Sequence, residues 1–364
     1  MQDRYVADEA RVSISSLEAE TIMKSTPVQT VKSILGRIGI EYEDGLPKEA
    51  YISALKEEFC SEPKWVLLML PKVMLDFLTE VWENSVIAMT EERWNYIEYL
   101  KIFGFLAYQM GNPVTDEPNR LIVVEEMKDN FYFLLKSRKN RKLLSVYDEW
   151  EKIISGFMYY YGFIETRMLY SLFLKISKKV ISYEDFLLFV KCRTSLWPFG
   201  AILKDTFGKN EYFQYLNVEN PDMLLEYVRQ HENLPYKPIK LEDLIYVSDA
   251  AGIDNRWRGV SELGNLFIDK MGLNYYRATV LVRTLLIMIK NGSSYEKLQE
   301  KVSILSFENA QIREEVQQAV RQIFENVPVF EYKGYSRAEY KRLSYQKQLK
   351  KRKNLFTIID GGKE

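Results

Sequence analysis

Histidine and cysteine are nearly absent from this chain. Its 364 residues include one histidine, His231, and two cysteines, Cys60 and Cys192. A zinc site built from Cys and His therefore has almost no ligands to draw on. A Ser-His-Asp or Cys-His catalytic arrangement would have to use His231, which we expect to be a solvated histidine beside a linker. Two distant cysteines in apolar helical stretches predict buried, reduced thiols and a reducing compartment.

Long apolar runs are also missing. The strongest run, residues 280–289, is interrupted by Arg283 and is too short to span a bilayer, so it predicts a buried core helix and no membrane association. The first residues are charged, which predicts that there is no signal peptide. Together with the cysteine usage, this indicates a soluble, cytoplasmic protein. Glycine (17) and proline (11) are sparse, which favours helices joined by short loops over an all-β protein.

Motifs of nucleotide-dependent enzymes are absent as well. The chain has no Walker A loop, no dinucleotide fingerprint and no strand–helix alternation. Acidic residues are plentiful, but the adjacent pair Glu125 and Glu126 would point in different directions on a helix. Both residues fit a helix start, where carboxylates favour the dipole. We therefore predict that the protein is not an enzyme, binds no metal and needs no cofactor.

What the chain has is apolar and aromatic residues, at 47% and 14% of its length. That content supports real cores, argues against long disorder and, at this length, predicts two or three domains. The run of Met158 and three tyrosines would point all around a helix axis, so at least part of it must pack in a core. Apolar residues at helical spacing predict many helices. They cover residues 27–38, 48–59, 71–82, 91–103, 125–135, 143–158, 167–177, 182–190, 241–251, 261–271, 274–290, 295–302 and 311–326.

Two pairs of β-prone runs interrupt this pattern. Residues 105–108 and 121–124 flank a polar, turn-rich loop, and residues 201–203 and 212–216 flank a second one. Helices followed by a hairpin are the outline of a winged helix. We therefore predict a mainly α, multi-module helical protein with short β-hairpins.

Several stretches resemble known folds. The segment VQTVKSILGRIGIEYEDGLPKEAYISALKEEF (28–59) resembles the small helical SAP-like fold found at the N-terminus of the Rho terminator. The segments FGFLAYQM to RLIVVEEMKD (103–129) and YYYGFIETRMLYSLF (159–173) resemble helix–wing segments in a group of uncharacterised bacterial proteins. In that group LPYKPIKLEDLI (234–245) and NVPVFEYKGYSRAEY (326–340) also have counterparts.

The chain departs from these relatives in two respects. Many of them end in a cysteine-rich zinc-binding motif, but this chain has no cysteine after Cys192, so that site is absent. DNA-binding SAP-like modules use basic residues, whereas this segment mixes cations with acids. The cations are Lys32, Arg37, Lys48 and Lys56, and the acids are Glu41, Glu43, Asp44, Glu49, Glu57 and Glu58. The resemblance implies a division into an N-terminal arm (1–26), a SAP-like helical module (27–90), a winged-helix-like unit (91–142), a second such unit (143–232), a helical C-terminal domain (233–328) and a basic tail (329–364).

Two basic clusters are the strongest binding candidates. The first follows the expected wing and its helix, as a connector that could contact several phosphates or simply be solvated. It consists of Lys136, Arg138, Lys139, Arg141 and Lys142. The second lies in the tail: residues 331–364 carry a net charge of +6 on a chain whose total is −1. Its cations are Lys341, Arg342, Lys347, Lys350, Lys351, Arg352 and Lys353, interleaved with tyrosine and phenylalanine.

Cations interleaved with aromatic rings suit nucleic acid, because the cations meet phosphates and the rings stack on bases. The tail could equally dock on a protein partner or on the acidic body of this chain, or serve only solubility. A third candidate, Arg256, Trp257 and Arg258, could stack on a base or a partner, although a core tryptophan between solvated arginines explains it too. The sequence thus favours a non-catalytic nucleic-acid-binding or regulatory adaptor. The alternative is a protein-interaction scaffold or inhibitor that acts through its acidic helical body, and a carboxylate-dependent enzyme is a distant third. The sequence leaves the oligomeric state open.

Overall fold

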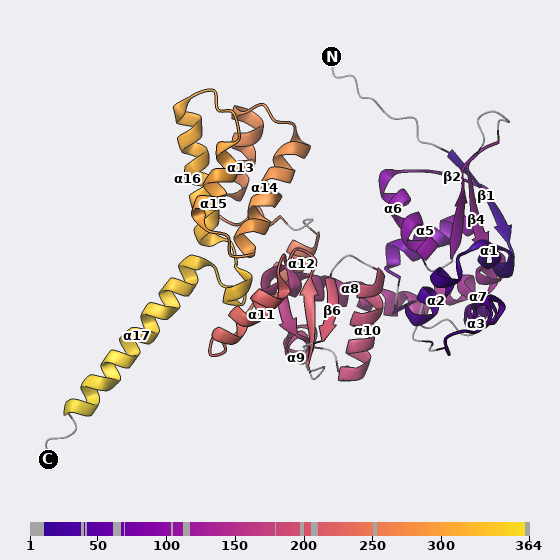
Figure 1. Ribbon diagram of the computed structural model, residues 1–364, viewed down its shortest axis with the longest axis horizontal. Coiled ribbons are helices and arrows are strands. Elements are labelled where there is room, and N and C mark those ends of the chain that lie inside the picture. The colour runs from indigo at the N-terminus through magenta and orange to yellow at the C-terminus, as the bar shows by residue number, and fades with distance from the viewer. Residues whose placement is uncertain are drawn as a thin grey trace. The chain divides into compact units, whose positions relative to one another are not determined.

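A computed structural model shows a mainly helical protein with two small sheets (Figure 1). It describes residues 11–37, 40, 42–60, 67–68, 70–102, 105–111, 117–178, 180–196, 200–204, 210–249 and 253–360. Two compact units are formed, each from more than one stretch of chain. Unit 1 contains residues 1–150 and 184–198, and unit 2 contains residues 151–183 and 199–364. None of the described helices is long and apolar enough to cross a membrane.

Unit 1 combines helices with a four-stranded sheet. Its helices are α1 (Ala19–Ser25), α2 (Val28–Arg37), α3 (Lys48–Cys60), α5 (Lys72–Glu83), α6 (Glu91–Ile102), α7 (Glu125–Lys136), the first half of α8 (Arg138–Tyr161) and most of α10 (Tyr183–Leu196). Its strands are β1 (Arg11–Leu17), β2 (Val86–Ala88), β3 (Leu106–Gln109) and β4 (Arg120–Val124). The helices expected at 27–38, 48–59, 71–82, 91–103 and 125–135 are confirmed within a residue or two.

The sheet of unit 1 has the strand order β2-β1-β4-β3. Strands β3 and β4 form the predicted antiparallel hairpin, with Leu106 opposite Val123. Strand β1 was not predicted, since residues 1–26 were expected to form a short helix or a loose arm. It pairs in parallel with β4, from Ser13 opposite Arg120 to Leu17 opposite Val124. A segment from the start of the chain therefore completes the sheet next to the hairpin.

The core of unit 1 lies between this sheet and its helices. On α5 the buried positions are Met74, Leu75, Phe77, Leu78, Val81 and Trp82. Val73 shares the helical spacing of these apolar residues but is 49% exposed, whereas Leu75 is buried. The Trp82 ring stacks on Phe131 of α7 at a centroid distance of 6.3 Å. The predicted basic connector is mostly helix, because α8 begins at Arg138 and only Ser137 separates it from α7.

Unit 2 contains a three-stranded sheet and a larger set of helices. Its strands are β5 (Phe163–Glu165), β6 (Gly200–Lys204) and β7 (Glu211–Tyr215), in the order β5-β7-β6, so the second predicted hairpin is confirmed. Its helices are the second half of α8, α9 (Thr166–Ser177), α11 (Pro221–Gln230), α12 (Leu241–Asp249), α13 (Val260–Asn265), α14 (Tyr275–Lys290), α15 (Tyr295–Ser303), α16 (Ala310–Asn326) and α17 (Arg337–Asp360). Helix α11 was not predicted, although Asn220 caps it by accepting a hydrogen bond from the backbone N–H of Met223 and Pro221 opens it.

Helices α13 to α16 share one apolar core, in which Phe267, Leu286, Val316 and Ile323 are fully buried. One helix was expected over 261–271. Instead α13 ends at Asn265, and the next turn, Leu266–Lys270, is a π-helix. The aromatic run at the end of α8 is buried throughout, as predicted for at least part of it: Met158 and the three tyrosines that follow are all in the core.

The expected tail does not begin at Pro328 as a loose segment. Val327, Val329 and Phe330 are buried, and Pro328 forms an isolated bridge with Ser336. The predicted linker at 233–240 also has Leu234 and Ile239 in the interior. Apolar side chains therefore hold both segments on the body of unit 2, and the polar C-terminal segment is a helix, α17 (Figure 1).

Candidate functional site

Helix α17 begins at a reciprocal pair of hydrogen bonds. The backbone N–H of Ser336 donates to Oε2 of Glu339 over 2.9 Å, and the backbone N–H of Glu339 donates to Oγ of Ser336 over 3.3 Å. This arrangement is a capping box, which satisfies two N–H groups that an open helix end would leave unpaired. Glu339 also accepts hydrogen bonds from Nζ of Lys237 at 2.6 and 2.8 Å. The start of the helix is thus fixed in place.

The first turns of α17 are anchored in the body of unit 2. The guanidinium of Arg337 lies over the Phe324 ring at 4.0 Å and donates to the carbonyl of Ser293 over 3.0 Å. Its burial lowers the pKa of this guanidinium, and nearby acidic groups partly offset the effect. One turn further, the Tyr340 ring stacks on Tyr332 with centroids 4.3 Å apart. These contacts hold the root of α17 on the rest of unit 2.

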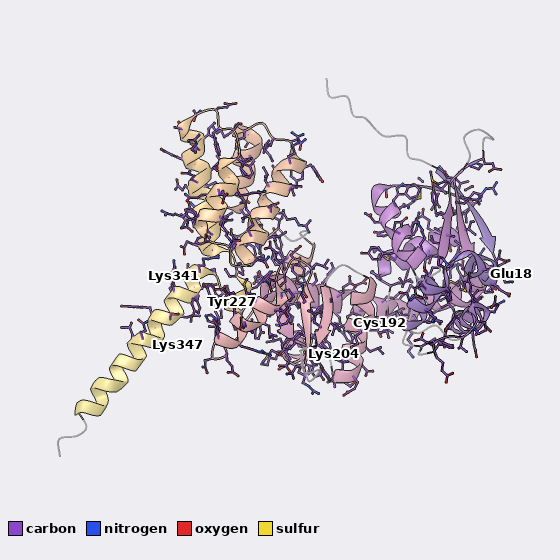
Figure 2. The ribbon with its side chains drawn as sticks, viewed as in Figure 1. Glu18, Cys192, Lys204, Tyr227, Lys341 and Lys347 are labelled. Atoms are coloured by element: carbon purple, nitrogen blue, oxygen red, sulfur yellow. The ribbon has the colours of Figure 1, made fainter. Side chains whose placement is uncertain are left out.

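Beyond this root the helix presents its side chains to solvent. Residues 345–349 are all exposed, including Tyr345 and Leu349, and Figure 2 shows Lys341 and Lys347 along the helix. Lys341 pairs with Glu325 at 3.1 Å, and Nζ of Lys347 approaches the carbonyl of Asn233 at 3.4 Å. The side chains of Lys350, Lys351, Arg352 and Lys353 lie outside the described residues. The sequence nevertheless places seven cations at positions 341–353 with no acid between Glu339 and Asp360.

The first predicted cluster lies where α7 meets α8, in unit 1. Lys136, the last residue of α7, lies over the Tyr132 ring at 3.7 Å and pairs with Glu83 at 3.4 Å. The other four cations, Arg138, Lys139, Arg141 and Lys142, occupy the first turns of α8. They are exposed and form no ion pair within the part of the chain that the structure describes. The first turn of α8 holds no acid, and the neighbouring Phe133 is 76% exposed.

The three side chains of the triplet at 256–258 lie in different environments. The guanidinium of Arg256 pairs with Asp254 at 2.8 Å and with Asp243 at 2.6 Å. Trp257 stacks on the buried Tyr159 ring with centroids 5.5 Å apart and is therefore part of the core. Arg258 is exposed and has no partner among the described residues. Only Arg258 of these three residues is free to meet a ligand.

A buried lysine was missed by sequence reasoning. Nζ of Lys290 donates to the carbonyl of Tyr159 over 2.5 Å and lies over the Tyr159 ring at 3.4 Å. Burial lowers the pKa of this amine well below its usual value, and the charge of Asp254 opposes that shift. Lys290 follows an apolar run at the end of α14. The one signal of its burial in the sequence is that it lies one helical turn after the apolar Leu286, on the same face of the helix.

The cysteine and the histidine whose side chains the structure describes are both at least partly buried. Burial raises the pKa of the Cys192 thiol to about 11, so it is a protonated core residue, and the Cys60 side chain lies outside the described residues. The prediction that His231 is solvated is wrong: it is half-buried, and its ring packs on Tyr332 and Tyr340 at 5.8 and 5.5 Å. Among the described residues no group of three His, Cys, Asp or Glu side chains is placed to hold a metal ion.

A pocket of about 470 Å³ lies between α13, the π-helix after it and α14. Its apolar wall comes from residues such as Val260, Ile268 and Val282. Its polar groups are all uncharged: Asn255, Ser261, Asn265, Tyr275 and Thr279. Sequence reasoning identified none of these residues, because they are spread over two helices and carry no motif.

Comparisons of the chain with protein-family models, with curated proteins and with solved structures found no match. What the protein does must therefore be inferred from its own side chains.

Proposed function

We propose that the protein is a non-catalytic nucleic-acid-binding adaptor and that α17 is its main contact. The observation that carries this proposal is a set of seven cations at positions 341–353, with no acid among them, on a helix whose residues 345–349 are all exposed. A helix segment whose exposed residues are mostly polar gains little from packing on its own body. Its surface is therefore free for a partner of opposite charge.

Helical structure makes this run suitable for a phosphate backbone. A basic helix can lie in the major groove, where phosphates flank it on both sides. The capping box and the Arg337 contacts hold the root of α17, so fewer backbone conformations are lost on binding than from an irregular tail. The exposed ring of Tyr345 can add stacking on a base.

The cations at the start of α8 are proposed as a second contact. Arg138, Lys139, Arg141 and Lys142 stand at a helix N-terminus, where the backbone dipole also favours an anion. We do not include the helix pair α2–α3, whose SAP-like identity remains a proposal. Its Lys32 forms an ion pair with Asp44 at 3.0 Å, and its Lys56 forms one with Glu126 at 3.5 Å, so both lysines are already paired with acidic side chains.

Winged-helix-like units are the second element of the proposal. In unit 2 the end of α8 is followed by β5 and α9, and the hairpin β6–β7 joins β5 in one sheet through β7, whereas residues 184–198 of α10 belong to unit 1. Helices followed by a hairpin resemble part of a winged helix, and winged helices serve both DNA and protein partners. This resemblance supports an adaptor role but does not distinguish DNA from protein partners. That distinction rests on the charged surfaces.

The test is the salt dependence of binding to labelled DNA, single-stranded and duplex, by fluorescence anisotropy. Each phosphate contact contributes about 0.7 to 0.9 to the slope of log K against log salt. The double variant Arg342→Gln/Lys347→Gln removes two exposed cations of α17. We expect it to reduce the slope by about 1.4 to 1.8 units between about 50 and 200 mM salt.

The matched control is Lys297→Gln/Lys301→Gln, which removes two exposed cations from α15. The net charge of the two variants is equal, so a difference between them reports the position of the charges. The proposal is wrong if the wild-type protein shows no binding at low salt, or if both variants change the slope equally.

A further inference from the structure

The residues that line the pocket beside α14 indicate which kind of ligand it can bind. No charged residue lines it, and its volume of about 470 Å³ falls in the range of small-molecule sites. An apolar wall, four side chains with amide or hydroxyl groups and one tyrosine ring favour an uncharged, largely flat ligand that has hydrogen-bonding groups on its edge.

The polar groups of the pocket are available for such a ligand. The side chains of Asn255, Asn265 and Thr279 make no hydrogen bond to any described residue. Hydrogen bonds that go unmade within the protein can be made to a ligand at little desolvation penalty when the groups are still open to water. An asparagine amide offers a donor and an acceptor side by side, which matches the edge of a nucleobase.

The rim adds an aromatic face. Tyr275 lines the pocket and is 77% exposed, so its ring is free to stack on a planar ligand. An uncharged, partly apolar groove beside an exposed aromatic ring fits a planar heterocycle.

We infer that the groove between α13 and α14 binds an unpaired nucleobase, with Asn255, Asn265 and Thr279 on its edge and Tyr275 on its face. The base can come from a free nucleotide or from a single strand, and the two sources share this chemistry. Base–aromatic stacking is sequence-tolerant because every base has a π-face. This inference deepens the proposed function but does not depend on α17, since it rests on a different surface.

Gly264 provides a way to close the pocket without disturbing the fold. It lines the pocket, it is helical, and a Cβ placed there meets nothing within 4 Å. Gly264→Leu therefore fills the groove. Gly36 of α2 has an equally empty surrounding, so Gly36→Leu adds the same side chain elsewhere and is the matched control. Both changes replace glycine in a helix, which favours folding.

The experiment compares a short single-stranded oligonucleotide with an abasic strand of the same length and charge, using the full chain. We expect the base-carrying strand to bind on the order of tenfold more tightly than the abasic strand. Gly264→Leu should reduce that ratio to about one and leave the abasic affinity unchanged, whereas Gly36→Leu should preserve the ratio. Titration of adenosine monophosphate, followed by the amide resonances of Asn265 and Thr279, identifies a free nucleotide as the source if it saturates at lower concentration than the strand.

The inference is overturned if the ratio is near one in the wild-type protein or if Gly264→Leu leaves it unchanged. These outcomes differ from failure of the proposed function. In that case neither strand binds with a salt-dependent affinity, yet the mononucleotide titration still reports on the pocket.

Discussion

Gly162 and Gly272 have similar backbone conformations but different neighbours, so the same substitution should have different effects at the two positions. Gly162, at the end of α8, and Gly272, after the π-helix, both have a left-handed backbone, with φ of 68° and 65°. A Cβ at Gly162 would lie 2.4 Å from the Phe330 ring, whereas a Cβ at Gly272 meets nothing within 4 Å. A side chain at either position would strain the left-handed backbone, but only at Gly162 would it also overlap another side chain.

We therefore expect Gly272→Ala to lower the free energy of unfolding by roughly 1 kcal/mol, which is the penalty of a left-handed L-residue. Gly162→Ala should lower it by about 3 kcal/mol, because displacing the Phe330 ring adds an overpacking penalty. Urea denaturation of the two variants measures the difference. Equal losses would show that Phe330 moves freely and does not close this end of the unit 2 core.

Lys290 predicts an unusual dependence of stability on pH. Because the folded-state pKa of its amine lies well below the unfolded value of 10.5, the unfolded chain binds more protons between these two pKa values. The free energy of unfolding therefore rises with pH in that window, by at most about 1.4 kcal/mol per pH unit.

Lys290→Met removes this contribution while keeping an unbranched side chain in the cavity. We expect the variant to be more stable than the wild-type protein at about pH 7, with an advantage that shrinks as the pH approaches 10.5. Urea denaturation of both proteins over this range measures the difference and cancels the contribution of the tyrosines. A constant difference across the range would mean that the amine stays protonated in the folded protein.

At the scale of elements, the first turn of α8 carries cations where a helix favours acids. Lys139→Glu should therefore stabilise the protein by about 0.3 to 1 kcal/mol through the helix dipole. If the cluster also contacts phosphates, the same change should weaken DNA binding and reduce the salt slope. Thermal denaturation and anisotropy on one variant separate the two effects. A variant that loses stability, or keeps full affinity, would contradict the role assigned to this turn.

The capping box of α17 makes a second prediction for an element. Ser336→Ala removes the hydroxyl that accepts the N–H of Glu339, and we expect a loss of about 1 kcal/mol, with faster amide exchange in the first turns of α17. The control is Ser303→Ala at the end of α15, whose hydroxyl bonds only to the carbonyl of Glu300. Unchanged exchange at residues 337–341 would show that the Arg337 and Glu339 contacts suffice to begin the helix.

Local patterns predicted the elements that local interactions form. The stripe from Met74 to Trp82 and both hairpins were visible because helical periodicity and turn residues act over a few positions. Strand β1 was missed because its partner, β4, is more than a hundred residues away, and Val12 and Ile14 alone do not indicate pairing. The pocket beside α14 was missed for the same reason, since Asn255, in the turn before α13, and Thr279 of α14 come together only through tertiary packing.

At the scale of the whole molecule, the two units exchange segments along the chain. Helix α10 lies in sequence between parts of unit 2, yet residues 184–198 belong to unit 1. Its Phe189 packs on Trp150 and Tyr147 with centroids 5.5 and 5.3 Å apart. Unit 1 can therefore complete its fold only after residues 151–183 of unit 2 have been synthesised.

This arrangement predicts which amides respond to a core substitution. Phe189→Ala should remove about 3 to 5 kcal/mol from unit 1. Its fully buried ring contacts residues of that unit, so exchange should accelerate in α5 and α7 more than in α14 and α16. Phe267→Ala, an equally buried phenylalanine of the α13–α16 core, is the matched change and should give the opposite pattern. Hydrogen exchange followed by mass spectrometry resolves these helices. Equal acceleration in both sets would show that the chain unfolds as one cooperative body, so that the division into units describes packing and not stability.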